Sequence, residues 1–280
     1  MLAYRHLFHA GGFTDVFKHA LLAQLVIALR SKVKPFLYLD THAGTGRYDL
    51  GHPWAQKNRE YHGGIARVWT RTDAPAALAP YLDAVRAENP DGRLRRYPGS
   101  PVIARGLLRA HDRMALTELN KTDCAALAEL FSGDKHVQVR LADGYDALKA
   151  FLPPRERRGI VFVDSSFDRA REFDRLKRGF VEAHRRFATG IHALWYPLME
   201  PPAMQAFERS IVATRIRRIL QLELSVRDAG GSGQLRGCGM LVANAPFGFE
   251  ATARSILQWL WPALSLNGEG GQQVRWICPE

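Results

Sequence analysis

Short apolar runs rich in β-branched residues alternate along this chain with longer stretches whose apolar positions have helical spacing. This alternation is typical of a parallel sheet that is covered by helices on both faces. It predicts strands at residues 36–40, 115–118, 137–142, 160–164, 192–196, 219–226, 240–244 and 274–277, and helices at residues 123–131, 173–186 and 250–260. The closely spaced strands near the C-terminus predict an antiparallel hairpin at one sheet edge. We therefore expect an α/β fold.

The longest apolar run extends from Ala20 to Leu29 and is too short to span a bilayer. It is not followed by the small-residue cleavage site of a signal peptide. We interpret it as a buried helix that begins near Thr14 and Asp15, either of which would cap it. These features predict no membrane partner. Three widely spaced cysteines, Cys124, Cys238 and Cys278, form no CxxC pair and no disulfide framework, so we interpret them as reduced thiols of a cytoplasmic protein.

Residues 47–98 interrupt the alternation because they contain no convincing strand. Their apolar positions, such as Tyr61, Ile65 and Val68, have helical spacing instead. We interpret this segment as a small helical insertion subdomain. It would divide a single α/β domain into residues 1–46 and 99–280.

Basic residues exceed acidic ones by 39 to 28 among the 280 residues, which gives a formal net charge of +11. Such an excess favours a polyanionic partner, above all a nucleic acid, although a basic protein without such a partner remains the alternative. Three runs concentrate the charge, at residues 93–96, 155–158 and 215–218. Runs of this kind are usually solvated surface. We favour phosphate contacts for one or two of them, because residues 155–158 directly precede the fourth strand.

A glycine-containing turn follows the first strand, in FLYLDTHAGTGRY at residues 36–48. Gly44 and Gly46 allow a ligand to approach the backbone beyond the strand end. The third glycine of the dinucleotide fingerprint is absent, since Asp49 occupies its place, so a nucleoside ligand without a pyrophosphate is favoured over NAD or FAD. On its own, this turn is equally consistent with a purely structural role.

Two further strand ends carry acidic residues. Glu118 ends the second strand, where a carboxylate accepts hydrogen bonds from both ribose hydroxyls. Asp143 and Gly144 follow the third strand, where they offer a purine amine an acceptor and a close backbone. The three strand ends together predict a nucleoside-containing cofactor.

The fourth strand leads into DSSF at residues 164–167. Methyltransferases that act on amino groups of nucleic acids carry an acidic or polar residue, two prolines and an aromatic residue at this place. The Asp164 carboxylate and the Ser165 carbonyl are candidates to accept the hydrogens of an adenine amine, and Phe167 is a candidate to stack on the base. Two serines replace the prolines that would stiffen the loop.

The chain resembles the RlmJ family, methyltransferases that make N6-methyladenine in 23S ribosomal RNA. The resemblance covers essentially the whole chain and is carried by YRHLFHAGGFTDVFKH, PFLYLDTHAGTGRYDL, YPGSPVIA, LTEL, ADG, RRFATG, ALWYP and WICPE. It implies a class I methyltransferase (Rossmann-like) fold with strand order 3-2-1-4-5-7-6 and S-adenosyl-L-methionine as the cofactor. It also implies a set of cofactor-binding residues: His19, His42, Ser100, Glu118, Asp143 and Gly144. To these we add Gly44, from the glycine turn, and Asp164.

The resemblance further assigns the proton-acceptor role to Asp164 and contacts with the RNA to Tyr4 and Lys18. We expect a monomer that acts on naked or protein-poor 23S RNA. We expect no metal, because His6, His9 and His19 lack zinc-site spacing. Two other classes stay open. One is a cofactor-binding RNA-binding or ribosome-assembly factor that has lost catalysis, and the other is a nicotinamide-dependent oxidoreductase.

Overall fold

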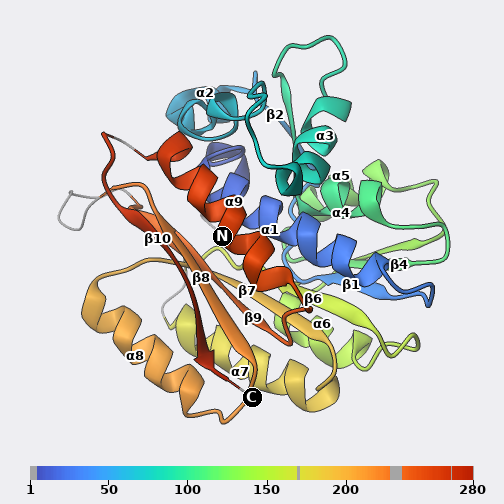
Figure 1. Ribbon diagram of the computed structural model, residues 1–280. Helices are drawn as coiled ribbons and strands as arrows, with labels where there is room; N and C mark the ends of the chain where they lie inside the picture. The colour runs from blue at the N-terminus through green and yellow to red at the C-terminus, as the bar shows by residue number, and fades with distance from the viewer. Residues whose placement is uncertain (1–4, 169–170, 228–234, 266, 280) are drawn as a thin grey trace.

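The computed structural model describes residues 5–168, 171–227, 235–265 and 267–279. Its main feature is an eight-stranded sheet in the order β10-β8-β9-β7-β6-β1-β4-β5 (Figure 1). These strands are β1 Leu37–Asp40, β4 Arg113–Glu118, β5 Val137–Leu141, β6 Gly159–Val163, β7 Ile191–Pro197, β8 Ile219–Ser225, β9 Gly237–Ala243 and β10 Gly271–Cys278. The helices are α1 Phe13–Arg30, α2 Pro53–Asn58, α3 Ala79–Ala87, α4 Ser100–Leu107, α5 Lys121–Leu130, α6 Gly144–Phe151, α7 Glu172–Arg186, α8 Pro201–Val212 and α9 Phe249–Leu264.

The strand pairing is that of a class I methyltransferase. Strands β5, β4, β1, β6 and β7 are parallel, and β9 pairs antiparallel with both β7 and β8. Numbered along the chain without the small strands described below, these seven give the order 3-2-1-4-5-7-6, and β10 adds an antiparallel edge strand beside β8. The predicted fold, all eight predicted strands and the C-terminal hairpin are therefore confirmed.

Two helical layers cover the sheet. Helices α1, α4, α5 and α9 contribute to one hydrophobic core, and α6, α7 and α8 contribute to the other (Figure 1). Strands β1, β6 and β7 are buried along their whole length, as expected for the middle of a sheet covered on both faces. The carboxyl ends of the parallel strands consequently meet at one rim of a rigid platform.

The expectation that residues 47–98 contain no strand is wrong at both ends of the segment. Arg47–Asp49 (β2) pairs antiparallel with Arg96–Pro98 (β3). Each strand has three residues, too few to produce a recognisable alternation of apolar and polar positions. Between them lie α2, α3 and short 3-10 helices, and the apolar side chains of α3 and of the 3-10 helices share the core of α1. The division of the chain into a main domain and an insertion subdomain stays a prediction.

The first helix is buried as predicted, but neither Thr14 nor Asp15 caps it. The helix begins at Phe13, and Gly12 occupies the cap position with an extended backbone. The Asp15 carboxylate instead accepts a hydrogen bond from the Gly11 N–H at 2.8 Å and is fully buried. No helix in the described part of the chain is long and apolar enough to cross a membrane.

Candidate active site

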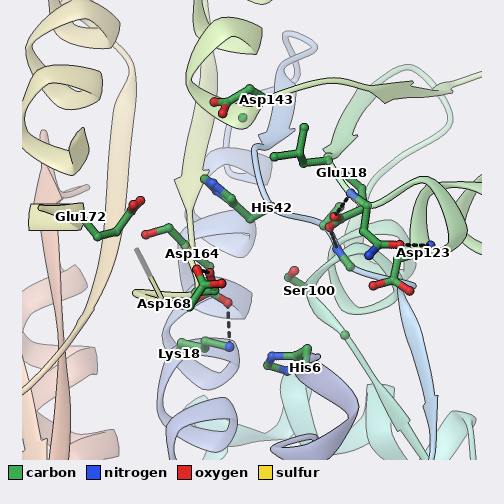
Figure 2. A pocket seen from close by; sticks show the side chains of 18 of the residues that line it. His6, Lys18, His42, Ser100, Glu118, Asp123, Asp143, Asp164, Asp168 and Glu172 are labelled. Atoms are coloured by element: carbon green, nitrogen blue, oxygen red, sulfur yellow. Dashed lines mark hydrogen bonds and ion pairs between the residues drawn. The ribbon is translucent and has the colours of Figure 1, made fainter. Parts of the chain in front are cut away.

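A pocket of about 920 Å³, including the space at its mouth, lies where the carboxyl ends of β1, β4, β5 and β6 meet (Figure 2). Helix α1 forms one wall and the start of α4 another. Most of the predicted site residues line this pocket: Lys18, His19, His42, Gly44, Ser100, Glu118, Asp143, Gly144, Asp164 and Ser165. Two predicted residues are not placed there. Phe167 is absent from the lining, and Tyr4 lies outside the described residues.

A buried carboxylate, Asp40, organises the turn after β1. It accepts hydrogen bonds from the Tyr38 hydroxyl at 2.8 Å, the Ser100 hydroxyl at 2.7 Å and the His42 N–H at 3.2 Å. Burial raises the pKa of Asp40 to about 6, although these three donors oppose the shift. Gly44 follows with φ +59°, and a Cβ there would lie 2.2 Å from the Tyr48 hydroxyl. The turn therefore requires glycine at this position.

Glu118 faces the same turn from the end of β4. Its Oε2 accepts the Gly44 N–H at 2.9 Å, and its Oε1 accepts the Asn120 N–H at 2.7 Å (Figure 2). Burial raises the pKa of Glu118, and both N–H groups oppose that shift. Each carboxylate oxygen has a second lone pair for a ligand hydroxyl. These acceptor positions fit the two hydroxyls of a ribose.

Asp143 has two structural partners besides its place in the pocket. It caps α6 by accepting the Tyr145 N–H at 2.9 Å, and it forms an ion pair with Arg175 of α7 at 2.9 Å. Burial opposes ionisation, but these two contacts lower the pKa of Asp143 below its ordinary value. Next to it, a Cβ on Gly144 would lie 2.2 Å from the Thr41 carbonyl oxygen, so α6 approaches the β1 turn as closely as a glycine permits.

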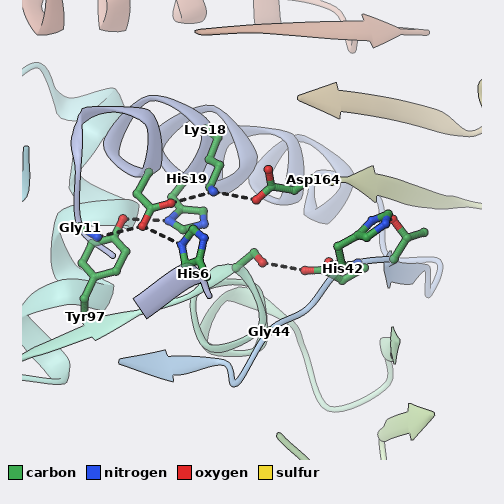
Figure 3. A network of polar contacts seen from close by, with 12 residues as sticks. His6, Gly11, Lys18, His19, His42, Gly44, Tyr97 and Asp164 are labelled. Carbon is green, nitrogen blue, oxygen red and sulfur yellow. Dashed lines mark hydrogen bonds and ion pairs between the residues drawn. The ribbon is translucent and has the colours of Figure 1, made fainter. Parts of the chain in front are cut away.

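A buried ammonium group connects α1 with the carboxyl end of β6. Lys18 Nζ lies 2.7 Å from Asp15 Oδ1 and 2.6 Å from Asp164 Oδ2 (Figure 3). Burial disfavours the charged form, but the two carboxylates outweigh it and raise the pKa of Lys18 above its usual value. In the described part of the chain, the other oxygen of Asp164 accepts no hydrogen bond from the protein. It is thus available to a substrate donor.

Three histidines near the pocket have three separate partners. His6 Nε2 lies 3.1 Å from Asp15, His9 Nδ1 lies 2.8 Å from Glu60, and His19 Nδ1 lies 2.8 Å from the Tyr97 hydroxyl. Burial lowers the pKa of His19 to about 3, so its ring is neutral at physiological pH. No group of three or more His, Cys, Asp or Glu side chains suited to a metal occurs among the described residues.

The DSSF segment begins directly after β6, which ends at Val163. Asp164, Ser165 and Ser166 line the pocket, and Ser165 is almost fully buried. Phe167 has φ +53° and packs edge-on against Phe173 and Trp195, with ring centroids 4.8 and 5.8 Å away. The aromatic ring therefore anchors the loop to the core in this structure.

Several residues that shape the pocket were not predicted from the sequence: His6, Asp15, Asp40, Glu172 and Arg175. For Asp40, the strand-end position was a usable signal. For Asp15, the i, i+3 spacing with Lys18 was another. Arg175 carried no signal, because its partner Asp143 lies 32 positions earlier, on a different element.

The basic runs at residues 155–158 and 215–218 are not beside the pocket. They precede β6 and β8, two strands with the same direction, so they lie at the opposite end of the sheet. Arg158 donates to the carbonyl oxygens of Leu29 and Lys34 and so joins α1 to the sheet. We favoured phosphate contacts for residues 155–158 because they directly precede β6. That reason is wrong, because they lie at the amino end of β6 and the pocket lies at its carboxyl end.

Comparison with known proteins agrees with this geometry. Residues 33–278 match the model of a family described as ribosomal RNA large subunit methyltransferase D, RlmJ. The chain belongs to this family. It is 44% identical over its whole length to the whole of "Ribosomal RNA large subunit methyltransferase J" of Escherichia coli, and 41% identical to the protein of that name of Haemophilus influenzae. The crystal structure of protein LPL1258 from Legionella pneumophila superposes with a TM-score of 0.89 at 33% identity, covering 96% of this chain and 98% of that one. Like its family, the chain is a methyltransferase.

Proposed function

We propose that the protein transfers the methyl group of S-adenosyl-L-methionine to the exocyclic amine of an adenine in 23S ribosomal RNA. The observation that carries this proposal is the pocket itself. Acceptors for a ribose and for an amine lie at the neighbouring ends of β4 and β5. The Asp164 carboxylate, which is ion-paired with Lys18, directly follows β6. Membership in the family of large-subunit rRNA methyltransferases supports the RNA substrate.

The side chains that line the pocket fit the cofactor. Glu118 would accept the ribose hydroxyls, and Asp143 with Gly144 would contact the adenine, while His19, His42, Gly44 and Ser100 complete the walls. Carboxylates predominate among the charged lining residues, an environment that suits a sulfonium cation. When bound, the cofactor supplies an electrophilic methyl group.

Asp164 acts on the nucleophile. The lone pair of an adenine amine is delocalised into the ring, so the nitrogen becomes nucleophilic only when its hydrogens are held by acceptors. Lys18 fixes one oxygen of Asp164 through a charge-assisted hydrogen bond, which directs the other oxygen to the amine. The carboxylate orients the amine and is placed to accept its proton. Phe167 stiffens the loop that carries these acceptors.

The test is methyl transfer to unmodified 23S RNA from labelled S-adenosylmethionine, with N6-methyladenosine identified after digestion. The wild type should form this product. Asp164→Asn, which keeps the shape and removes the carboxylate, should lower kcat at least about 100-fold while cofactor affinity falls only modestly. Full turnover by this variant would remove Asp164 from its role, and cofactor binding without product in the wild type would favour a non-catalytic RNA-binding factor.

We further expect a monomer that acts in the cytoplasm, without a metal, on 23S RNA that carries few or no ribosomal proteins. Tyr4 and Lys18 are expected to contact the RNA. These points stay predictions. Methylation of naked 23S RNA, compared with a 50S particle at equal concentration, tests the form of the substrate.

A further inference from the structure

Two aromatic side chains beside the pocket mouth have no part in the machinery described above. Phe8, in the short helix His6–Phe8, stacks on Trp54 of α2 with ring centroids 5.3 Å apart and an interplanar angle of 16°. Trp54 remains 41% exposed, so part of its indole ring faces solvent although Phe8 stacks on it. We call this pair the Phe8–Trp54 patch.

The patch is continuous with the pocket. Arg5 forms an ion pair with Asp123, which lines the pocket, at 2.8 Å, and its guanidinium lies 5.8 Å from the centre of the Trp54 ring. Lys57 Nζ lies 5.9 Å from the centre of the other ring of the patch, that of Phe8. His6, two residues before Phe8, also lines the pocket. A single path of contacts therefore leads from the pocket to Lys57.

The chemistry of the patch matches unpaired nucleic acid. Bases stack on aromatic rings without regard to sequence, and cations beside the rings meet the phosphates. Enzymes that act on a base amine take the target out of the helical stack, which leaves the neighbouring nucleotides in need of new partners. Arg5 lies over the Trp54 ring and Lys57 over the Phe8 ring, so each ring of the stack has a cation beside it for the backbone of such a nucleotide.

We propose that the Phe8–Trp54 patch is a stacking platform for an unpaired nucleotide next to the adenine in the pocket. The inference rests on the proposed function and adds the place where the flanking RNA binds. Trp54 provides the stacking surface, Phe8 supports it from below, and Arg5 and Lys57 contact the phosphates. The patch thus selects single-stranded over paired RNA.

The experiment measures the Kd of the full-length protein for a single-stranded RNA oligonucleotide and for a fully paired duplex of the same sequence, at one fixed salt concentration. Trp54→Ala should weaken binding of the single strand at least about fivefold. It should leave the Kd for the duplex unchanged and so reduce the discrimination between the two. Trp54→Phe should restore most of the loss.

Trp276→Ala is the matched control. Trp276 is 38% exposed but lies on β10, paired with Leu220 at the end of the sheet opposite the pocket, so this variant should bind both RNAs like the wild type. Equal single-strand affinity of Trp54→Ala and wild type would overturn the platform, and so would an equal loss for both RNAs. Because this readout is binding, it is separate from the methylation assay, whose failure would instead remove the proposed function.

Discussion

At the scale of single residues, Asp15 supports two pocket residues although its own side chain is buried behind them. It contacts His6, Gly11 and Lys18, and Lys18 in turn contacts Asp164. Spacing along one helix predicts that Asp15 and Lys18 meet. No local pattern predicts that Asp164, far along the chain, completes the network. Residue types at strand ends were therefore predictable, whereas their buried partners on other elements were not.

Asp15→Asn should lower the free energy of unfolding by about 2–3 kcal/mol. This is less than the usual cost of breaking a buried ion pair, because Lys18 retains its second ion pair, with Asp164. Burial is outweighed by His6 and Lys18, which hold the pKa of Asp15 well below its usual value. Its contribution is thus present at neutral pH and is lost only as the pH falls below the ordinary aspartate range. Urea unfolding at pH 7 measures the loss. Asp146→Asn, whose ion pair with Lys149 is exposed, should unfold like the wild type.

His19 should make the folded state sensitive to mild acid. Its pKa is lowered to about 3 by burial, whereas in the unfolded chain it is near 6.5. Between these values the unfolded state binds the proton and the folded state does not, so stability falls as the pH falls, by up to about 1.4 kcal/mol per pH unit. His19→Gln, compared with wild type by urea unfolding at pH 7 and pH 5, should reduce this pH dependence. An unchanged slope would contradict the neutral buried ring.

At the scale of elements, hydrophobic periodicity predicted the eight strands of the main sheet, and all of them except the edge strands β5 and β10 are buried over at least four consecutive positions. It missed β2 and β3, whose three residues pair with each other rather than with the sheet. The sequence also predicted a side-chain cap from Thr14 or Asp15, whereas α1 begins at Phe13 and its cap residue, Gly12, has no side chain to accept a hydrogen bond. Burial of a whole element leaves a pattern in the sequence, whereas the geometry of its first turn depends on tertiary contacts.

Gly144→Ala should separate α6 from the β1 turn. The added Cβ would meet the Thr41 carbonyl at 2.2 Å and the His42 ring at 2.9 Å, and backbone cannot yield as a flexible side chain does. We expect the Kd for S-adenosylmethionine, measured by calorimetry, to rise at least about tenfold, which corresponds to about 1.4 kcal/mol of binding free energy.

Gly106→Ala provides the control for this change, because Gly106 lies inside α4 and has no atom within 4 Å of an added Cβ. Alanine there should keep the affinity and stabilise the helix by about 0.5–1 kcal/mol. Unchanged cofactor affinity in the Gly144 variant would show that the α6 approach does not shape the pocket.

The loop after β6 should gain from stiffening. Ser165→Pro with Ser166→Pro restricts φ at both positions and so reduces the conformations that the unliganded loop samples. We expect kcat for 23S RNA to rise several-fold, with the KM for the cofactor unchanged. The upper limit of the gain is about 100-fold, the loss of rate that a small misplacement of the reacting groups causes. A lower kcat in a protein that unfolds normally would show that the serine loop already holds its active geometry.

At the scale of the whole molecule, the net charge of +11 predicted a polyanionic partner but not the face that binds it. Counting charges along the chain singled out the runs at residues 155–158 and 215–218, which the fold places opposite the pocket. The cations beside the pocket mouth, Arg5 and Lys57, are isolated in the sequence and form no run. Only the fold brings them to one surface.

This arrangement predicts that RNA binding depends on the basic residues near the pocket and not on those at the opposite end of the sheet. Each phosphate contact that is lost should lower the slope of log K against log salt by about 0.7–0.9. Lys57→Gln should therefore reduce the slope for single-stranded RNA by about that amount, whereas Arg155→Gln with Arg217→Gln should leave it unchanged, although it removes twice the charge. Binding titrations at salt concentrations from about 50 to about 200 mM give the slope for each variant and so distinguish the two. If the distant double variant changes the slope and Lys57→Gln does not, the RNA lies across the far end of the sheet, and the pocket is reached from another side.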